Sequence, residues 1–326
     1  MDEKLLEIRD LTVHYVVDKE TVEALTNINL ILNRKETLGL VGETGAGKTT
    51  LALSIMKLVP DPPGRIIGGE IIFEGEDLLK KSNEEMRKIR GRKISMIFQD
   101  PMTSLNPVLT VGEQIVEVIL LHNKISKADA HRRAVDILES VGIPGERFSE
   151  YPHQFSGGMK QRVVIAIALA CNPELLLADE PTTALDVTIQ AQVLEMMRSL
   201  QEKMGTSTIL ITHDLGVVAE ICDKVAIVYA GEVVEYGTLE QIFNNPQHPY
   251  TLGLFGSLPN LEKEVHRLSP IPGMMPDPSN LPEGCNFCER CTQALPECAL
   301  RKVRVVEVEP GHLVKCHKFV KGGAAE

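Results

Sequence analysis

This chain of 326 residues has no apolar run of the about 20 residues that a membrane-spanning helix needs, so we do not expect it to cross a membrane. Residues Met1 to Lys4 lack the basic region and following apolar segment of a secretory signal, and we expect a cytoplasmic protein. An excess of basic residues is missing too: 34 Lys and Arg stand against 45 Asp and Glu, giving a net charge of −11. Because nucleic-acid binding needs clustered basic residues, nucleic acid is not an expected partner.

Short apolar segments of strand length alternate with helix-length segments over residues 1–250. The segment from Leu5 to Val17 alternates with period two, which is typical of a strand with one solvated face. Four further segments are short and wholly apolar or nearly so, and we expect them to be buried strands: residues 37–41, 175–178, 208–212 and 224–229. This alternation predicts a largely parallel sheet with helices on both faces.

The middle of the chain, about residues 100–160, is predicted to be helical. Ser126 and Asp129 form a helix start, and Gly142 ends that helix. From about His248 onward, closely spaced prolines interrupt every regular pattern, and cysteines follow. We therefore expect a nucleotide-binding domain over residues 1–250, with a helical subdomain at about 100–160, and a loop-rich extension over 251–326. A loop-rich extension of this kind cannot bury much apolar surface alone, so something else must hold it.

Residues 42–49 read Gly-Glu-Thr-Gly-Ala-Gly-Lys-Thr and match the Walker A pattern of phosphate-binding loops. The glycines allow backbone N–H groups to surround phosphate oxygens, and the following helix adds its positive N-terminal dipole. Lys48 is expected to reach the β- and γ-phosphates, and the Thr49 hydroxyl to bind Mg²⁺. The sequence thus predicts an ATP and Mg²⁺ site with the binding residues Gly42, Gly45, Gly47, Lys48, Thr49 and Thr50.

Residues 175–180 read Leu-Leu-Leu-Ala-Asp-Glu, an apolar run that ends in two acids. Asp179 at the strand tip is suited to the Mg²⁺ shell, and Glu180 to polarising the attacking water. Taken alone, this segment could equally be a strand followed by two solvated acidic residues without a catalytic role. The Walker A loop in the same sheet favours the catalytic interpretation, with Glu180 as the residue on which hydrolysis depends.

Residues 155–162 read Phe-Ser-Gly-Gly-Met-Lys-Gln-Arg, a glycine turn that opens a helix and forms a second anion site. One nucleotide rarely needs two phosphate cradles from one chain. The segment resembles the signature motif of ABC ATPases, Leu-Ser-Gly-Gly-Gln, with Phe155 and Met159 as departures. The resemblance implies that Ser156 and Gly158 contact the γ-phosphate of an ATP molecule held by a second subunit.

Other matches to the ABC family follow in order, and the resemblance covers about residues 5–250. It implies that Tyr15 stacks on adenine, although a tyrosine here is also an ordinary strand residue. It implies that Gln99 links Mg²⁺ to the helical subdomain and that His213 contacts the γ-phosphate. Ala184 to Asp186 resembles the D-loop. The implied catalytic residues are Glu180, Gln99 and His213, and the implied Mg²⁺ ligands are Thr49, Gln99 and Asp179.

The family resemblance implies an α/β P-loop NTPase with a RecA-like core, an N-terminal antiparallel β region, a helical subdomain and a loop-rich, cysteine-containing C-terminal extension. Two copies or two paralogues are expected to enclose two ATP molecules head to tail. The tail, including residues 248–251 and 309–312, resembles the ATPase subunits of oligopeptide, dipeptide and nickel importers. The expected function is therefore to energise peptide import, with nickel import as the alternative.

The resemblance to these importers implies a location at the cytoplasmic face of the membrane and several partners. These are a second, commonly non-identical ATPase subunit, two transmembrane permease subunits and, indirectly, an extracytoplasmic binding protein. The segment from Gln99 to about Val116, rich in Pro and Asn, is predicted to meet the permease. Two rival hypotheses remain: a soluble ABC ATPase without a membrane partner, and a redox or metal sensor that carries an inherited ATPase domain.

Five of the seven cysteines lie between Cys285 and Cys316. In a reducing compartment this density indicates metal binding before disulfides. A [4Fe–4S] cluster is predicted on Cys285, Cys291, Cys298 and Cys316, a spacing that resembles the tails of the peptide importers, and it would stabilise an extension with little core. Cys288 completes the opening of a ferredoxin-like run and could replace one ligand. A four-cysteine Zn²⁺ site is the alternative.

Overall fold

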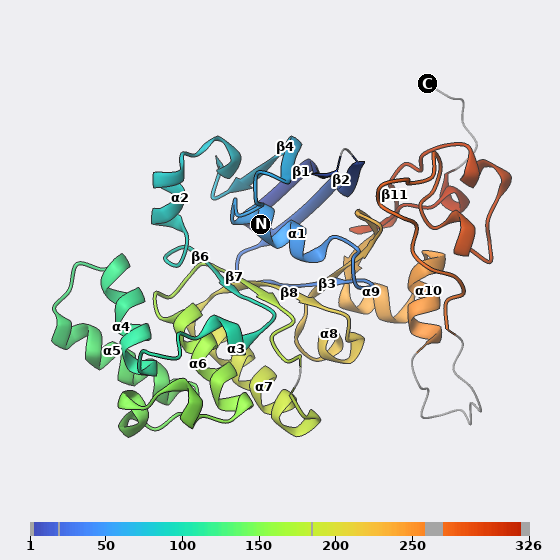
Figure 1. Ribbon diagram of the computed structural model, residues 1–326. Coiled ribbons are helices and arrows are strands. Elements are labelled where there is room, and N and C mark those ends of the chain that lie inside the picture. Colours follow the sequence, from blue (N-terminus) through green and yellow to red (C-terminus); the bar gives the residue numbers. More distant parts are fainter. Residues whose placement is uncertain (1–2, 19, 184, 258–269, 321–326) are drawn as a thin grey trace.

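The computed structural model describes residues 3–18, 20–183, 185–257 and 270–320, which form two sheets (Figure 1). In the smaller sheet, which has the order β2-β1-β4-β5, each strand pairs antiparallel with its neighbour. Its strands are β1 (Lys4–Val17), β2 (Glu20–Asn33), β4 (Gly64–Phe73) and β5 (Glu76–Asp77). The alternation at the start of the sequence correctly predicted β1, and the family resemblance correctly implied an antiparallel N-terminal region.

The larger sheet has the order β11-β12-β10-β9-β3-β8-β7-β6. Its central strands β9, β3, β8, β7 and β6 are parallel to one another, as the sequence predicted. The strands are β3 (Thr37–Val41), β6 (Ile94–Ile97), β7 (Leu175–Asp179), β8 (Ser207–Thr212), β9 (Lys224–Tyr229), β10 (Glu232–Thr238), β11 (Val306–Glu309) and β12 (His312–Val314). The last two belong to the C-terminal extension, which therefore continues the main sheet at its edge.

Both faces of the main sheet are buried, but they are covered differently. Leu175 and Leu177 of β7 belong to a cluster with the antiparallel sheet and α1 (Lys48–Ile55), while Leu176 and Ala178 belong to a second cluster. That second cluster is covered by helices, among them α7 (Val187–Met204) and α8 (Leu215–Ile221), on the opposite side of the sheet (Figure 1). The prediction of helices on both faces is thus incomplete, because the antiparallel sheet covers most of one face.

The helical subdomain contains α3 (Pro101–Ser104), α4 (Val111–His122), α5 (Lys127–Ser140) and α6 (Gly157–Leu169). Helix α5 begins as predicted, because the Ser126 hydroxyl accepts a hydrogen bond from the Asp129 N–H. It ends just before Gly142, whose φ of +76° an L side chain rarely adopts. A further short helix, α2 (Asn83–Ile89), connects the antiparallel sheet to β6.

The extension lies at the opposite end of the molecule from the helical subdomain (Figure 1). It follows α9 (Leu239–Asn244) and α10 (Pro249–Gly256), and β12 pairs with β10. Apart from β11 and β12, its described regular structure consists of 3-10 turns at Cys288–Arg290, Pro296–Ala299 and His317–Phe319, as its prolines predict. Within the described parts of the chain, no helix combines the length and the apolar character needed to cross a bilayer.

Candidate active site

The Walker A loop joins β3 to the N-terminus of α1, so the predicted strand–loop–helix arrangement is present. A Cβ on Gly42 would lie 2.1 Å from the carbonyl oxygen of Val228, which no side chain permits. Gly47 has a φ of +102°, a conformation that costs glycine little. Gly42 is therefore required for the loop to pack against Val228, and Gly47 for the left-handed turn into α1.

Lys48 and Thr49 connect this loop to its surroundings. The Lys48 ammonium donates to the carbonyl oxygens of Gly42 at 2.7 Å and Glu43 at 2.9 Å, and burial lowers the pKa of Lys48. The Thr49 hydroxyl donates to Oδ2 of Asp179 at 2.8 Å. Asp179 is 2% exposed, and burial raises the pKa of this carboxyl against the opposing hydrogen bond from Thr49. Hydroxyl and carboxylate oxygens are the ligands that Mg²⁺ prefers, so the donor set fits a magnesium ion.

Glu180 follows β7 with a φ of +48°, unusual for glutamate and typical of strained functional positions. Its Oε2 accepts hydrogen bonds from Nε2 of Gln99 at 3.1 Å and from the Thr183 hydroxyl at 2.9 Å. Its Oε1 lies 3.1 Å from Nδ1 of His213. Burial would raise the pKa of Glu180, but the hydrogen bonds from Thr183 and His213 outweigh it, and the pKa is lowered. The carboxylate is therefore held ionised and oriented.

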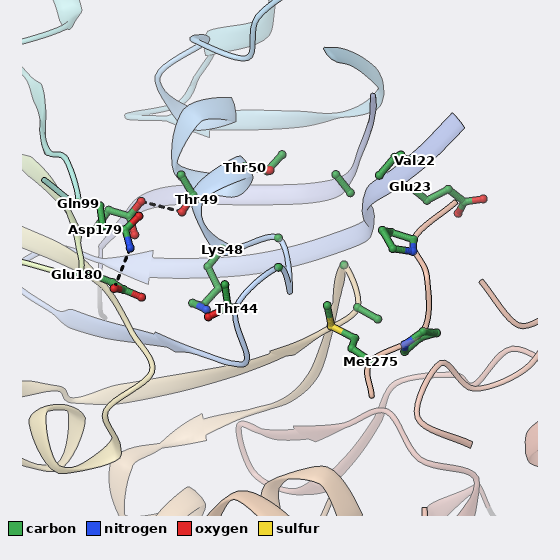
Figure 2. Close-up of a pocket in the computed structure, with 17 residues that line it drawn as sticks. Val22, Glu23, Thr44, Lys48, Thr49, Thr50, Gln99, Asp179, Glu180 and Met275 are labelled. Carbon is green, nitrogen blue, oxygen red and sulfur yellow. Dashed lines mark hydrogen bonds between the residues drawn. The ribbon is translucent and has the colours of Figure 1, made fainter. Parts of the chain in front are cut away.

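A cavity brings these groups together at the carboxyl ends of the parallel strands (Figure 2). Eight predicted residues line it: Gly45, Gly47, Lys48, Thr49, Thr50, Gln99, Asp179 and Glu180. Gly42 packs against Val228 and does not line the cavity. His213 does not line it either, but it contacts the lining residue Glu180. The sequence analysis missed Thr183, and it missed the wall formed by Val22, Glu23, Ala24, Ala230, Gly231, Met275, Pro276 and Pro278. The one local signal for this contact is that Thr183 lies three residues after Glu180, close enough in sequence for its hydroxyl to bond the carboxylate.

Besides Gly42 and His213, three further predicted ATP contacts do not line this cavity. Tyr15, on β1 of the antiparallel sheet, is partly buried against the core, although its cross-strand partner Val22 is a lining residue. Ser156 caps α6 by accepting a hydrogen bond from the Met159 N–H, and it belongs with Gly158 to the helical subdomain. Adenine stacking by Tyr15 and the role of the signature loop in a second subunit's site remain predictions. Of the predicted D-loop, Ala184 lies outside the described residues.

The five clustered cysteines line one pocket, together with His248 and His317. They are Cys285, Cys288, Cys291, Cys298 and Cys316, and none forms a disulfide. Burial raises the pKa of the Cys285 thiol to about 12. Within the described residues, no three or more His, Cys, Asp or Glu side chains lie close enough together to hold a metal ion. The structure thus gathers the predicted thiols but confirms neither the iron–sulfur cluster nor the zinc alternative.

A phosphate-binding loop, a buried carboxylate beside it and an oriented glutamate at the ends of a parallel sheet define a P-loop ATPase. The sequence matches the ABC transporter family over residues 25–183 and the C-terminal region of oligopeptide/dipeptide transporters over residues 234–298. The chain belongs to the ABC transporter ATPases, in the oligopeptide/dipeptide branch, as its motifs and its tail predicted.

Relatives of similar length support this assignment. The chain is 53% identical to the oligopeptide transport ATP-binding protein OppD of Bacillus subtilis (strain 168) over 315 residues, covering 96% of this chain and 88% of that one. It is 51% identical to the dipeptide transport ATP-binding protein DppD of the same organism, covering 91% and 89%. Among solved structures, the dimeric bacterial ABC transporter cassette MJ0796 is similar, with a TM-score of 0.65 and 30% identity, covering 72% of this chain and 98% of that chain. A second structure of that cassette, 29% identical with the same TM-score and coverage, is a dimeric post-hydrolysis state bound to ADP and Pi.

Proposed function

We propose that this protein is the ATP-hydrolysing subunit of a peptide importer. The observation that carries the proposal is the oriented Glu180 carboxylate beside the Walker A loop, in a chain whose tail matches the oligopeptide/dipeptide transporter region. The names of the relatives, which include oligopeptide and dipeptide transport proteins, favour peptides over nickel as the solute.

The chemistry follows from the positions of the side chains. Lys48 is placed to neutralise the β- and γ-phosphates, and Thr49, Asp179 and Gln99 to hold a magnesium ion, which supplies charge neutralisation when bound. Glu180 accepts a hydrogen bond from the attacking water, orients it in line with the γ-phosphate and draws proton density from it. Gln99 and Thr183 keep the glutamate in that orientation, and His213 lies beside Oε1, where it can contact the γ-phosphate.

A second ATPase subunit would complete each site. Ser156 and Gly158 do not line their own chain's cavity, and Ser156 is exposed at the start of α6. Exposed N–H groups at a helix start bind phosphate oxygens, so this loop is suited to an ATP molecule on a facing subunit. The related cassette MJ0796 is dimeric. We propose a homologous, non-identical partner, since this branch commonly pairs two different ATPases.

The segment from Gln99 to about Val116 is proposed to contact a transmembrane permease subunit at the cytoplasmic face of the membrane. Gln99 donates to Glu180, so the segment begins at the hydrolysis site. The turn after α3 is attached to α4, because Gln114 accepts from the Asn106 N–H and donates to the Asn106 and Leu109 carbonyls. Val108, at the tip of this turn, is 76% exposed. An apolar side chain on a braced turn is suited to insertion between partner helices.

The decisive experiment isolates the tagged protein from its own membranes in detergent and reconstitutes the complex in vesicles with its binding protein. Two membrane subunits and a second ATPase are expected to co-purify, and peptides are expected to stimulate ATP hydrolysis. Stimulation by Ni²⁺ without an effect of peptides would move the assignment to nickel import. ATP hydrolysis by a protein that never recovers with membrane subunits would support the soluble alternative.

The cysteine pocket supports a second proposal, a structural [4Fe–4S] cluster bound by Cys285, Cys291, Cys298 and Cys316. The donor set fits, because thiolates are the usual ligands of such clusters and five thiols surround one pocket. Because burial raises the pKa of the Cys285, Cys291 and Cys316 thiols, metal binding would have to displace their protons and draw the sulfurs closer. A zinc ion on the same thiols is the alternative.

A further inference from the structure

One wall of the ATP cavity comes from the C-terminal extension, not from the ATPase core. We call residues 272–278 the proline segment. The Glu23 N–H at the start of β2 donates to the Pro278 carbonyl at 2.8 Å, which attaches the segment to the antiparallel sheet. Met275, Pro276 and Pro278 line the cavity. Figure 2 shows Met275 beside the Walker A loop, away from Asp179 and Glu180.

Met275 holds the proline segment against the Walker A loop. Its side chain is partly buried and packs against both hydrophobic clusters. Its Cε lies 3.3 Å from the position that a Cβ on Gly45 would occupy. The neighbouring Met274, by contrast, is 89% exposed and does not line the cavity. Met275 is therefore the residue of this segment whose side chain bridges the extension and the phosphate loop.

Arg290, which lies between Cys288 and Cys291, ties the same segment to the loop. Its Nη1 contacts both carboxylate oxygens of Glu43, at 3.0 and 3.1 Å, while its Nε donates to the Pro272 carbonyl at 2.9 Å. Only 7% of the Arg290 side chain is exposed. Glu43 belongs to the Walker A loop, and its carbonyl oxygen accepts from Lys48. One buried guanidinium thus joins the proline segment to the loop that binds phosphate.

We propose that the proline segment is the wall that binds the nucleoside end of ATP, with Met275 in contact with the ribose and adenine and Arg290 positioning that wall. Figure 2 shows Asp179 and Glu180 on one side of the cavity and Val22 and Glu23 on the other. The proline segment is attached to this second side, because the Pro278 carbonyl accepts from the Glu23 N–H. The lining residues of the segment, Met275 and two prolines, carry no charge to bind phosphate. An apolar wall with a methionine thioether suits a flat aromatic base.

This inference rests on the ATPase assignment and goes beyond it. It makes nucleotide affinity depend on an extension that lies outside every Walker and signature motif. The alternative is that the proline segment only stabilises the fold. That alternative predicts a lower free energy of unfolding without a selective loss of nucleoside binding. Comparing a ligand that contains a nucleoside with one that lacks it therefore distinguishes the proposal from this alternative.

The test uses Met275→Ala, Met275→Leu and the matched control Met274→Ala in the full-length protein. Dissociation constants are measured for ATP and for inorganic tripolyphosphate, and KM and kcat for ATP. Met275→Ala should weaken ATP binding about tenfold, because several apolar contacts with the ligand are lost. Tripolyphosphate binding should fall much less, and the loss should appear in KM rather than in kcat. Met275→Leu keeps the apolar bulk and should recover part of the ATP affinity, whereas Met274→Ala should resemble the wild type.

Equal weakening of ATP and tripolyphosphate by Met275→Ala, or unchanged ATP binding, would overturn the proposal. A wild-type protein that binds neither ligand would contradict the ATPase assignment instead.

The role of Arg290 is tested by a double-variant experiment. Arg290→Met should weaken ATP binding. Met275→Ala should lower the ATP affinity much less in that background, because the wall is no longer positioned. Arg290→Lys keeps the charge and should restore part of the affinity. Additive losses in the double variant would contradict the positioning role of Arg290.

Discussion

Nε2 of His312 lies 2.8 Å from Oε1 of Glu235, and neither side chain is accessible to solvent. The same carboxylate accepts hydrogen bonds from the backbone N–H groups of Gln247 and His248. Glu235 belongs to β10, His312 to β12, and the two amides precede α10. One buried carboxylate therefore attaches the extension and the last helix to the edge of the ATPase sheet.

Glu235→Ala should destabilise the protein by about 3 kcal/mol, because the buried His312 ring and two backbone amides, one of them buried, lose their common partner. The free energy of unfolding is measured in urea. Glu283→Ala, which removes an exposed glutamate of the extension, serves as the control and should change it by less than about 0.5 kcal/mol. A Glu235→Ala protein as stable as this control would mean that the contact is not needed to attach the extension.

Glu180→Gln should lower ATP turnover by about a thousandfold, because the amide cannot draw a proton from water. ATP binding should be retained, and a closed dimer should accumulate. Steady-state hydrolysis, nucleotide binding and size-exclusion chromatography with ATP measure these effects. Glu202→Gln, on the exposed side of α7, should behave like the wild type. Near-normal turnover of Glu180→Gln would remove Glu180 from its assigned role.

Thr183→Val should lower kcat about tenfold and leave KM for ATP nearly unchanged. The valine cannot donate to Oε2 of Glu180, so one of the bonds that orient the carboxylate is lost. Thr183→Ser keeps the hydroxyl and should recover most of the activity. If the serine variant is as slow as the valine variant, the hydroxyl is not what positions Glu180.

A photoactivatable residue at position 104 or 106 should crosslink to a permease subunit in the assembled complex. Both positions are exposed and adjoin the turn held by Gln114. Crosslinking should change when ATP is bound, because the segment begins at Gln99 in the hydrolysis site. The same residue at position 202 on α7 should give no permease adduct. Failure at both 104 and 106 would contradict the proposed contact surface.

Protein purified without oxygen should contain iron and acid-labile sulfide in about equal amounts, as a [4Fe–4S] cluster requires. Cys298→Ser should remove both, since Cys298 is a buried member of the pocket, while Cys171→Ser outside it should not. Colourless protein with one zinc ion per chain and no sulfide would replace the cluster with the zinc alternative. Protein with neither metal would contradict both.

Local sequence signals predicted several of the residues that the structure brings together in the cavity. Gly42 to Thr49 determines a loop between a strand and a helix, because a side chain at Gly42 or Gly47 would meet neighbouring backbone, and Gly45 and Gly47 have positive φ. Asp179 and Glu180 follow an apolar strand, and parallel strands bring their carboxyl ends to one edge. The start of α5 at Ser126 and its end before Gly142 were likewise readable, since capping depends on residues three or four positions apart.

Tertiary structure alone decided which distant residues complete that site. Met275 and Arg290 are more than 200 positions away from Gly45 and Glu43 in the sequence, and no periodicity or motif connects them. The same holds for Glu235 and His312, whose contact exists because β12 pairs with β10. Motifs report the conformation of neighbouring residues, whereas these contacts depend on how the extension packs against the finished sheet. The sequence determined the loop and the strand end that line one side of the cavity, and packing of the extension determined the wall that contains Met275.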